Sequence, residues 1–306
     1  MLQTKDIVSM KNMTAEEITE ILDVAATMKQ VIDAPSKKTA HLVGKSIVTL
    51  FYENSTRTRM SFEMAAKYMS ASASNISAST SSVAKGETLI DTGRTLDQMG
   101  TDIIIIRHPM SGAPQFLGKH INASVINGGD GMNEHPTQAL LDMYTMRDKK
   151  GDLKGLEVAI IGDVLHSRVA RSNIWGLQKM GANVRLAAPS TLLPKEFEQT
   201  GAKIFYDPKK AADGADVVMG LRIQRERQQS GLFPSVREYS QFFGIDDSVV
   251  DAADKDVIIM HPGPMNRGVE INSNIADSDR SFIEEQVKNG LAVRMSLMFL
   301  LTRRHV

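Results

Sequence analysis

The chain has 306 residues, 42% hydrophobic and 24% charged, and its 36 Lys and Arg balance its 36 Asp and Glu. This balance argues against a general attraction to nucleic acid or to an anionic membrane, so any anion site must come from locally placed arginines. The lack of cysteine excludes disulfides, thiolate catalysis and cysteine-bound metal. The length suggests about two domains.

The first residues are acidic and amphipathic and lack the apolar core of a signal peptide. No apolar run approaches the roughly 20 residues needed to cross a bilayer. We therefore expect a cytoplasmic protein that binds neither membrane nor nucleic acid.

Strands and helices are predicted to alternate through the first half of the chain. Thr14 and Glu17 form a capping-box pattern that predicts the start of the first helix. Further strands are predicted over 45–53, 101–108 and 124–129, and further helices over 58–69, 88–99 and 135–148. The Ser- and Ala-rich stretch 70–87 is compatible with either a flexible loop or a binding loop.

The polar stretch 149–155 is the best candidate domain boundary, and the alternation restarts beyond it. Strands are predicted over 156–163, 183–189, 202–207, 215–222 and 255–264, with helices over 167–182 and, as one or two pieces, 279–301. Such alternation predicts an α/β protein whose two domains each contain a mainly parallel sheet flanked by helices.

Residues 55–58, Ser-Thr-Arg-Thr, stand between a predicted strand and a predicted helix. Free backbone N–H groups at a helix start attract anions, hydroxyls add donors, and the planar guanidinium of Arg57 suits phosphate. The alternative is ordinary N-capping with a solvated arginine.

Other polar residues also follow predicted strands. Arg107 ends a run of four isoleucines, which predicts a position at the sheet edge. His135 and Gln138 are three residues apart at a helix start, so both can face one ligand, although a single histidine there is more often structural.

Three clusters in the second half resemble ligand-binding loops less clearly. Residues 162–168 form a strand–turn–helix without the Gly-x-Gly-x-x-Gly pattern, so a dinucleotide site is not supported. Residues 221–227 are rich in arginine and are alternatively a charged loop with internal ion pairs. The prolines of 261–264 stiffen a turn that can present backbone carbonyls to an amide.

Taken together, STRTR (55–59), IRH (106–108) and HPTQALLD (135–142) resemble the signatures of the transcarbamoylase family, and the resemblance covers essentially the whole chain. The SSVAKGET loop (81–88), the LRIQRER segment (221–227) and the HPGP turn are closer to the aspartate-specific members. The ornithine-specific members characteristically carry a cysteine-containing HCLP turn. The resemblance implies transfer of a carbamoyl group from carbamoyl phosphate to L-aspartate, in pyrimidine biosynthesis.

The same resemblance assigns the carbamoyl phosphate site. Residues expected to bind the phosphate are Ser55, Thr56, Arg57 and Thr58. Arg107 is expected to bridge phosphate and carbonyl oxygen, and His135 to polarise the carbonyl. The carbamoyl NH₂ is expected to contact Gln138 and the Gly263–Pro264 turn; the family often has leucine or alanine at position 263.

For aspartate, the expected carboxylate ligands are Arg168, Arg222 and Gln224. Ser81 and Lys85 are expected to reach the site of a neighbouring subunit, which implies a homotrimer with shared active sites. The residues expected to act on the reacting atoms are Arg57, Thr58, Lys85, Arg107 and His135.

The implied domains are 1–148 for carbamoyl phosphate, completed by a C-terminal helix at about 285–306, and 149–284 for aspartate. No metal or organic cofactor is expected; positioning and charge stabilisation would drive the reaction, helped by domain closure. The alternatives are a transcarbamoylase for ornithine or another amine, and a non-catalytic protein that binds a phosphorylated metabolite.

Overall fold

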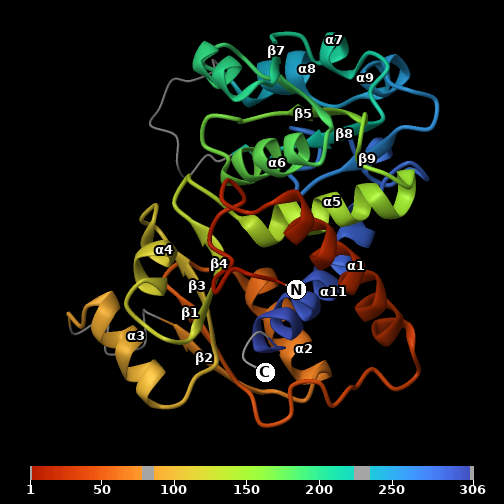
Figure 1. Cartoon of the computed structure of the whole chain (residues 1–306). Coiled ribbons are helices and arrows are strands. Elements are labelled where there is room, and N and C mark those ends of the chain that lie inside the picture. Colours follow the sequence, from red (N-terminus) through yellow and green to blue (C-terminus); the bar gives the residue numbers. More distant parts are fainter. Residues whose placement is uncertain (1, 78–85, 224–234, 304–306) are drawn as a thin grey trace. The chain divides into compact units, whose positions relative to one another are not determined.

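The computed structural model describes residues 2–77, 86–223 and 235–303, and the chain divides into two compact units (Figure 1). Unit 1 comprises Met1–Leu141 and Lys288–Val306, and unit 2 comprises Asp142–Val287. Both changes of unit fall inside helices, namely α5 (Pro136–Lys150) and α11 (Ile283–Arg303). The units thus change at 141/142 and 287/288, where the sequence predicted 148/149 and 284/285.

Unit 1 contains a parallel four-stranded sheet in the order β2-β1-β3-β4. Its strands are β1 (Ser46–Phe51), β2 (Ser72–Ser77), β3 (Ile103–His108) and β4 (Ser124–Asp130). The isoleucine run of β3 and all of β4 are buried, as expected for strands of a sheet covered on both faces; Arg107, next to that run, is partly exposed.

Helices cover both faces of this sheet (Figure 1). One face packs Val48, Leu50 and Ile104 against Leu96 and Leu117 of two helices, α3 (Leu89–Gln98) and α4 (Ala113–Gly118). The other face is covered by α2 (Thr56–Tyr68) and by the unit 1 part of α11.

The C-terminal helix belongs to unit 1 for most of its length. The Ser296 hydroxyl of α11 donates to the Ile21 carbonyl of α1 (Ala15–Asp33) at 2.7 Å. The buried Arg294 guanidinium donates to the Ser61 hydroxyl of α2 at 2.9 Å and lies 5.1 Å from the Phe62 ring centroid. The fold therefore brings the end of the chain back to its first domain, as the sequence predicted.

Unit 2 contains a parallel five-stranded sheet in the order β7-β6-β5-β8-β9. Its strands are β5 (Glu157–Ile161), β6 (Asn183–Ala187), β7 (Lys203–Phe205), β8 (Val217–Gly220) and β9 (Ile258–Met260). The helical segments of this unit are α6 (Arg168–Lys179), η3 (Lys195–Thr200), α7 (Pro208–Ala212), α8 (Val236–Phe243), α9 (Asp247–Ala252) and α10 (Ser273–Ala276).

The sequence predictions of this architecture are largely confirmed. The Thr14–Glu17 capping box is present, and the tail forms one helix rather than two. Within the Ser- and Ala-rich stretch, Ser72–Ser77 forms β2 instead of a loop. This strand is mostly exposed, so its sequence shows no apolar pattern. Its backbone is held by parallel pairing with β1.

Candidate active site

The carboxyl ends of β1 and β3 place the first group of predicted residues at one edge of the unit 1 sheet, where parallel α/β sheets bind ligands. Ser55 is the N-cap of α2, and Thr56 and Arg57 occupy its first turn. The Ser55 side chain makes no capping hydrogen bond, so it does not occupy the N–H groups at this helix start. Thr58 is buried, with 8% of its surface exposed. This edge has the donors that an anion requires.

Arg107 lies at the same edge, paired in register with Phe51 of β1. Its Nε lies 3.2 Å from Oε2 of Glu53, and one terminal nitrogen donates to the Gly128 carbonyl at 3.3 Å. Because these two acceptors come from neighbouring strand ends, they hold the guanidinium at the sheet edge.

His135 and Gln138 lie at the start of α5 and are 5% and 8% exposed. The His135 carbonyl accepts from the amides of Gln138 and Ala139, at 3.0 and 3.3 Å, so His135 closes the first turn of the helix. Its Nδ1 lies 3.4 Å from the Thr137 hydroxyl. Seven predicted residues thus lie at or just beyond the carboxyl ends of the unit 1 strands, and we call this set the unit 1 half-site. They are Ser55, Thr56, Arg57, Thr58, Arg107, His135 and Gln138.

Next to this half-site, His108 is buried at the end of β3, with its ring centroid 4.5 Å from that of Tyr52. Burial lowers the pKa of His108, and the nearby carboxylates Glu53 and Asp130 only partly oppose this. Nδ1 accepts from the Met110 amide at 3.0 Å, which suits the neutral imidazole.

In unit 2, Arg168 is the first residue of α6 and is 4% exposed. It follows a compact turn in which the fully buried Asp163 accepts from the His166 backbone N–H at 3.2 Å and from His166 Nδ1 at 2.9 Å. Gly162, with φ of +137°, allows this turn: a Cβ there would lie 2.7 Å from the Leu221 carbonyl oxygen. The turn therefore sets where α6 and Arg168 begin.

Arg222 follows β8 and is partly buried. The 261–264 turn follows β9, and its contacts run through the imidazole of the buried His261. The Gly263 amide donates to His261 Nδ1 at 2.9 Å, and His261 Nε2 lies 3.5 Å from Oε1 of the buried Glu270. Gly263 adopts a left-handed φ of +60°. Four predicted residues, Arg168, Arg222, Gly263 and Pro264, thus follow strands of the unit 2 sheet, and we call this set the unit 2 half-site.

Three further predictions, Ser81, Lys85 and Gln224, lie outside the described residues. Within the described residues, no cluster of three or more histidine, aspartate or glutamate side chains is arranged to hold a metal ion. In the same part of the chain, no helix has the length and apolar character needed to span a membrane.

Comparison with known families assigns both units. Residues 5–148 match the family model described as aspartate/ornithine carbamoyltransferase, carbamoyl-P binding domain, and residues 154–301 match the Asp/Orn binding domain. The chain belongs to this family.

Proteins of similar sequence include the aspartate carbamoyltransferase catalytic subunits of Ruminiclostridium cellulolyticum and Acetivibrio thermocellus. They are 65% and 64% identical, over 100% and 99% of this chain and 97% of each relative. Among solved structures, the aspartate transcarbamoylase of Trypanosoma cruzi, in complex with carbamoyl phosphate and aspartate, is 29% identical with a TM-score of 0.86, covering 97% of both chains.

The ornithine carbamoyltransferase of Pyrococcus furiosus is 31% identical with a TM-score of 0.84, covering 96% of this chain and 95% of its own. Fold similarity alone therefore does not separate the two substrate types within the family. The much higher identity to relatives named for aspartate does.

Sequence reasoning missed the carboxylates that support both half-sites. Glu53 contacts Arg107, Asp163 fixes the turn before Arg168, and Glu270 contacts His261 of the 261–264 turn. Glu53 stands two residues before the STRTR motif and Asp163 lies inside the 162–168 cluster, so proximity to a strand end was an available signal. Glu270 had none, because it contacts the turn from six residues beyond it.

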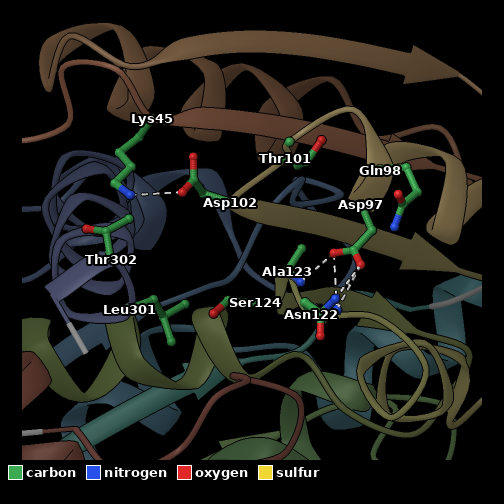
Figure 2. Close-up of a pocket in the computed structure, with 11 residues that line it drawn as sticks. Lys45, Asp97, Gln98, Thr101, Asp102, Asn122, Ala123, Ser124, Leu301 and Thr302 are labelled. Carbon is green, nitrogen blue, oxygen red and sulfur yellow. Dashed lines mark hydrogen bonds and ion pairs between the residues drawn. The ribbon is translucent and has the colours of Figure 1, made fainter. Parts of the chain in front are cut away.

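A pocket of about 360 Å³ in unit 1 lies at the opposite edge of the sheet, at the amino ends of β1, β3 and β4 (Figure 2). Its charged groups are already engaged: Lys45 pairs with Asp102 at 2.9 Å, and Asp97 accepts from the backbone of Asn122 and Ala123. None of the predicted site residues lines this pocket. The chemistry of the carboxyl-end edge, rather than the pocket, marks the candidate active site.

Proposed function

We propose that this chain transfers the carbamoyl group of carbamoyl phosphate to the amine of L-aspartate, forming N-carbamoyl-L-aspartate and phosphate. The observation that carries the proposal is the unit 1 half-site, where Arg57, Arg107 and His135 stand at one sheet edge with the start of α2. Relatives at 64–65% identity are named for this activity.

In this proposal, unit 1 binds carbamoyl phosphate. The phosphate is held by the start of α2 and Arg57, and Arg107 bridges it to the carbonyl oxygen. His135 and Thr58 stabilise the negative charge that develops on that oxygen, and Gln138 binds the carbamoyl NH₂. Arg107 suits a bridging role because Glu53 and Gly128 fix its orientation before substrate arrives.

Unit 2 binds aspartate through Arg168 and Arg222, whose guanidinium groups suit its two carboxylates. The deprotonated amine attacks the carbamoyl carbon and forms a C–N bond. The C–O bond to phosphate then breaks, and phosphate leaves with the electron pair and accepts the amine proton. Every step uses positioning and fixed charge.

The proposal extends to the setting of the reaction. A homotrimer with shared active sites, a place in pyrimidine biosynthesis and a cytoplasmic location follow from the family resemblance. In this proposal Ser81 and Lys85 act in the active site of the neighbouring subunit, which allows the trimer to be tested. Lys85→Ala and Arg57→Ala chains should each be inactive alone, and should regain activity when mixed and reassembled, because some shared sites then contain neither substitution.

An assay that offers aspartate and ornithine in parallel, each with carbamoyl phosphate, tests the substrate. We expect phosphate release and carbamoyl-aspartate formation with aspartate only. Release with ornithine alone would assign the second family activity, whose fold is equally similar. Binding of carbamoyl phosphate without any product would instead indicate a non-catalytic binding protein.

A further inference from the structure

The first residues of the chain run along the outer edge of β4, the last strand of the unit 1 sheet, although sequence analysis gave them no role. Ile7 forms a parallel bridge with Ile126: its amide donates to the Val125 carbonyl at 2.9 Å, and its carbonyl accepts from the Asn127 amide at 2.8 Å. We call residues 4–11 the N-terminal segment. It acts as a short extra strand beside β4.

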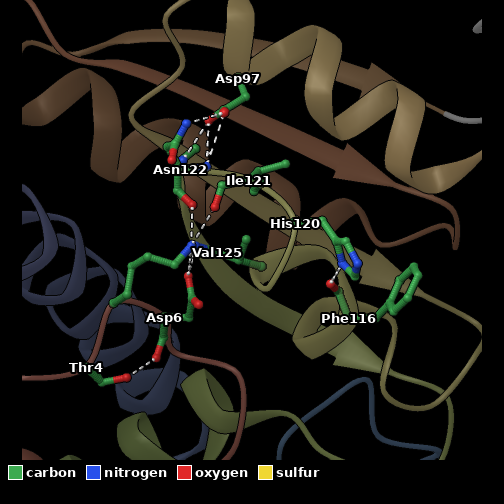
Figure 3. Close-up of polar contacts among 10 residues, drawn as sticks. Thr4, Asp6, Asp97, Phe116, His120, Ile121, Asn122 and Val125 are labelled. Atoms are coloured by element: carbon green, nitrogen blue, oxygen red, sulfur yellow. Dashed lines mark hydrogen bonds and ion pairs between the residues drawn. The ribbon is translucent and has the colours of Figure 1, made fainter.

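Side chains anchor one end of the N-terminal segment (Figure 3). Lys5 Nζ donates to the carbonyls of Ile121 and Ala123, at 3.0 and 3.1 Å, and the Asp6 carboxylate accepts from the Val125 amide at 2.8 Å. The fit is close, because a Cβ on Gly118 would lie 2.6 Å from Asp6 Oδ2.

The other end of the N-terminal segment meets Glu134, the residue directly before His135. The Glu134 side chain is 4% exposed and accepts from the Ser9 hydroxyl at 2.5 Å, the Met10 amide at 2.8 Å and the Lys11 amide at 3.5 Å. A buried carboxylate is costly unless donors surround it, and here the N-terminal segment provides three.

The backbone of Glu134 is fixed as well. Its amide donates to Asp130 Oδ1 at 3.1 Å, and its carbonyl accepts from the Asp130 amide at 3.1 Å. Glu134 and the first turn of α5 therefore hold the backbone on the two sides of His135.

We propose that Glu134 is a positioning residue for His135. The N-terminal segment holds the Glu134 side chain in place, and Glu134 in turn fixes the position of the His135 imidazole. The proposal rests on the proposed function, in which His135 stabilises charge on the carbonyl oxygen. Glu134 does not itself act on substrate, because its carboxylate is directed to Ser9, Met10 and Lys11.

Glu134→Gln tests this in the full chain. The glutamine amide keeps one acceptor oxygen, but its NH₂ group faces hydrogen-bond donors of the N-terminal segment. The contact between residue 134 and this segment is therefore weakened. Since small displacements of a catalytic group are costly, we expect kcat to fall about tenfold, with little change in the KM for aspartate. Ser9→Ala, which removes one donor, should lower kcat less and in the same direction.

Glu17→Gln is the matched control. Glu17 also accepts from two backbone amides near the chain start, Thr4 at 3.2 Å and Thr14 at 3.0 Å, but contacts nothing in the loop that carries His135. We expect it to lower the thermal midpoint less than Glu134→Gln does, because Glu17 is only partly buried, and to leave kcat unchanged.

The second readout is the NMR signal of the His135 imidazole, assigned by its loss in His135→Asn. We expect this signal to shift in Glu134→Gln and not in Glu17→Gln. A wild-type kcat and an unshifted signal in Glu134→Gln would overturn the inference. A wild-type protein that transfers no carbamoyl group would instead count against the proposed function, and the NMR comparison would still decide the role of Glu134.

Discussion

The two half-sites obtain their binding groups in different ways. In unit 1 the groups proposed to bind anions are the start of α2, which includes Arg57, and Arg107 near the end of β3, so chain direction alone brings them to one edge. In unit 2, Arg168 and the 261–264 turn depend on buried carboxylates, Asp163 and Glu270. The residues of the unit 1 half-site are therefore recognisable as contiguous sequence motifs. Those of the unit 2 half-site depend on buried carboxylates that no motif marks.

The largest expected effect concerns Arg57 in unit 1. Arg57→Ala removes a donor for the phosphate, so we expect kcat to fall on the order of 10²–10³-fold. Arg59→Ala is the control, because Arg59 pairs with Glu63 within α2 at 3.9 Å and has no assigned substrate contact. Near wild-type turnover by Arg57→Ala at saturating substrate would remove the basis for the unit 1 half-site.

Asp163→Asn tests the carboxylate dependence of unit 2. It replaces an acceptor of two hydrogen bonds from His166, and losing one charged hydrogen bond costs about 1.5–3 kcal/mol. We expect the KM for aspartate to rise about tenfold or more, while calorimetric binding of carbamoyl phosphate stays unchanged.

Asp246→Asn is the matched control for that substitution. Asp246 caps α9 in the same unit, and asparagine caps a helix about as well as aspartate. Equal effects of the two substitutions on aspartate KM would show that Asp163 has no special role.

Gly263→Ala examines the turn of the unit 2 half-site with a smaller change. A left-handed φ costs an L-residue about 1–2 kcal/mol, so urea denaturation should show that loss of stability, together with a raised KM. Gly214 has nearly the same φ, +62° against +60°, with nothing within 4 Å of its Cβ position. Gly214→Ala should cost similar stability and leave the kinetics unchanged; a kinetic effect of both would mean that strain spreads through unit 2.

The smallest effect is expected from His108 in unit 1. Because burial lowers its folded pKa below the ordinary 6.5, the unfolded chain takes up a proton first as the pH falls. The contribution of neutral His108 to stability is therefore present above about pH 6.5 and lost below it. In urea denaturation, the free energy of unfolding should fall less between pH 7 and pH 5 for His108→Asn than for the wild type. An identical change with pH in both proteins would contradict this.

The sequence predicted much of this fold because the buried strands carry continuous apolar runs, as in Ile103–Ile106, and because the helices begin with recognisable caps such as Thr14. It did not predict β2, whose exposed serines and alanines are ordered by backbone pairing. The arginines and hydroxyls of the half-sites stand in contiguous motifs. Their supports could not be read in the same way, because Glu134 meets Ser9 and Met10 across more than 120 residues of chain.

The return of α11 to unit 1 also has a consequence for synthesis. Residues 142–287 are contiguous, so unit 2 has all its residues once they leave the ribosome, whereas unit 1 still lacks Lys288–Arg303 and the contacts of Arg294 and Ser296. At usual rates of translation the ribosome needs roughly 10–30 s to make the intervening stretch. The unit that is begun first is thus completed last, and in a nascent chain stalled before residue 288 we expect protease to cut residues 2–141 faster than residues 142–287.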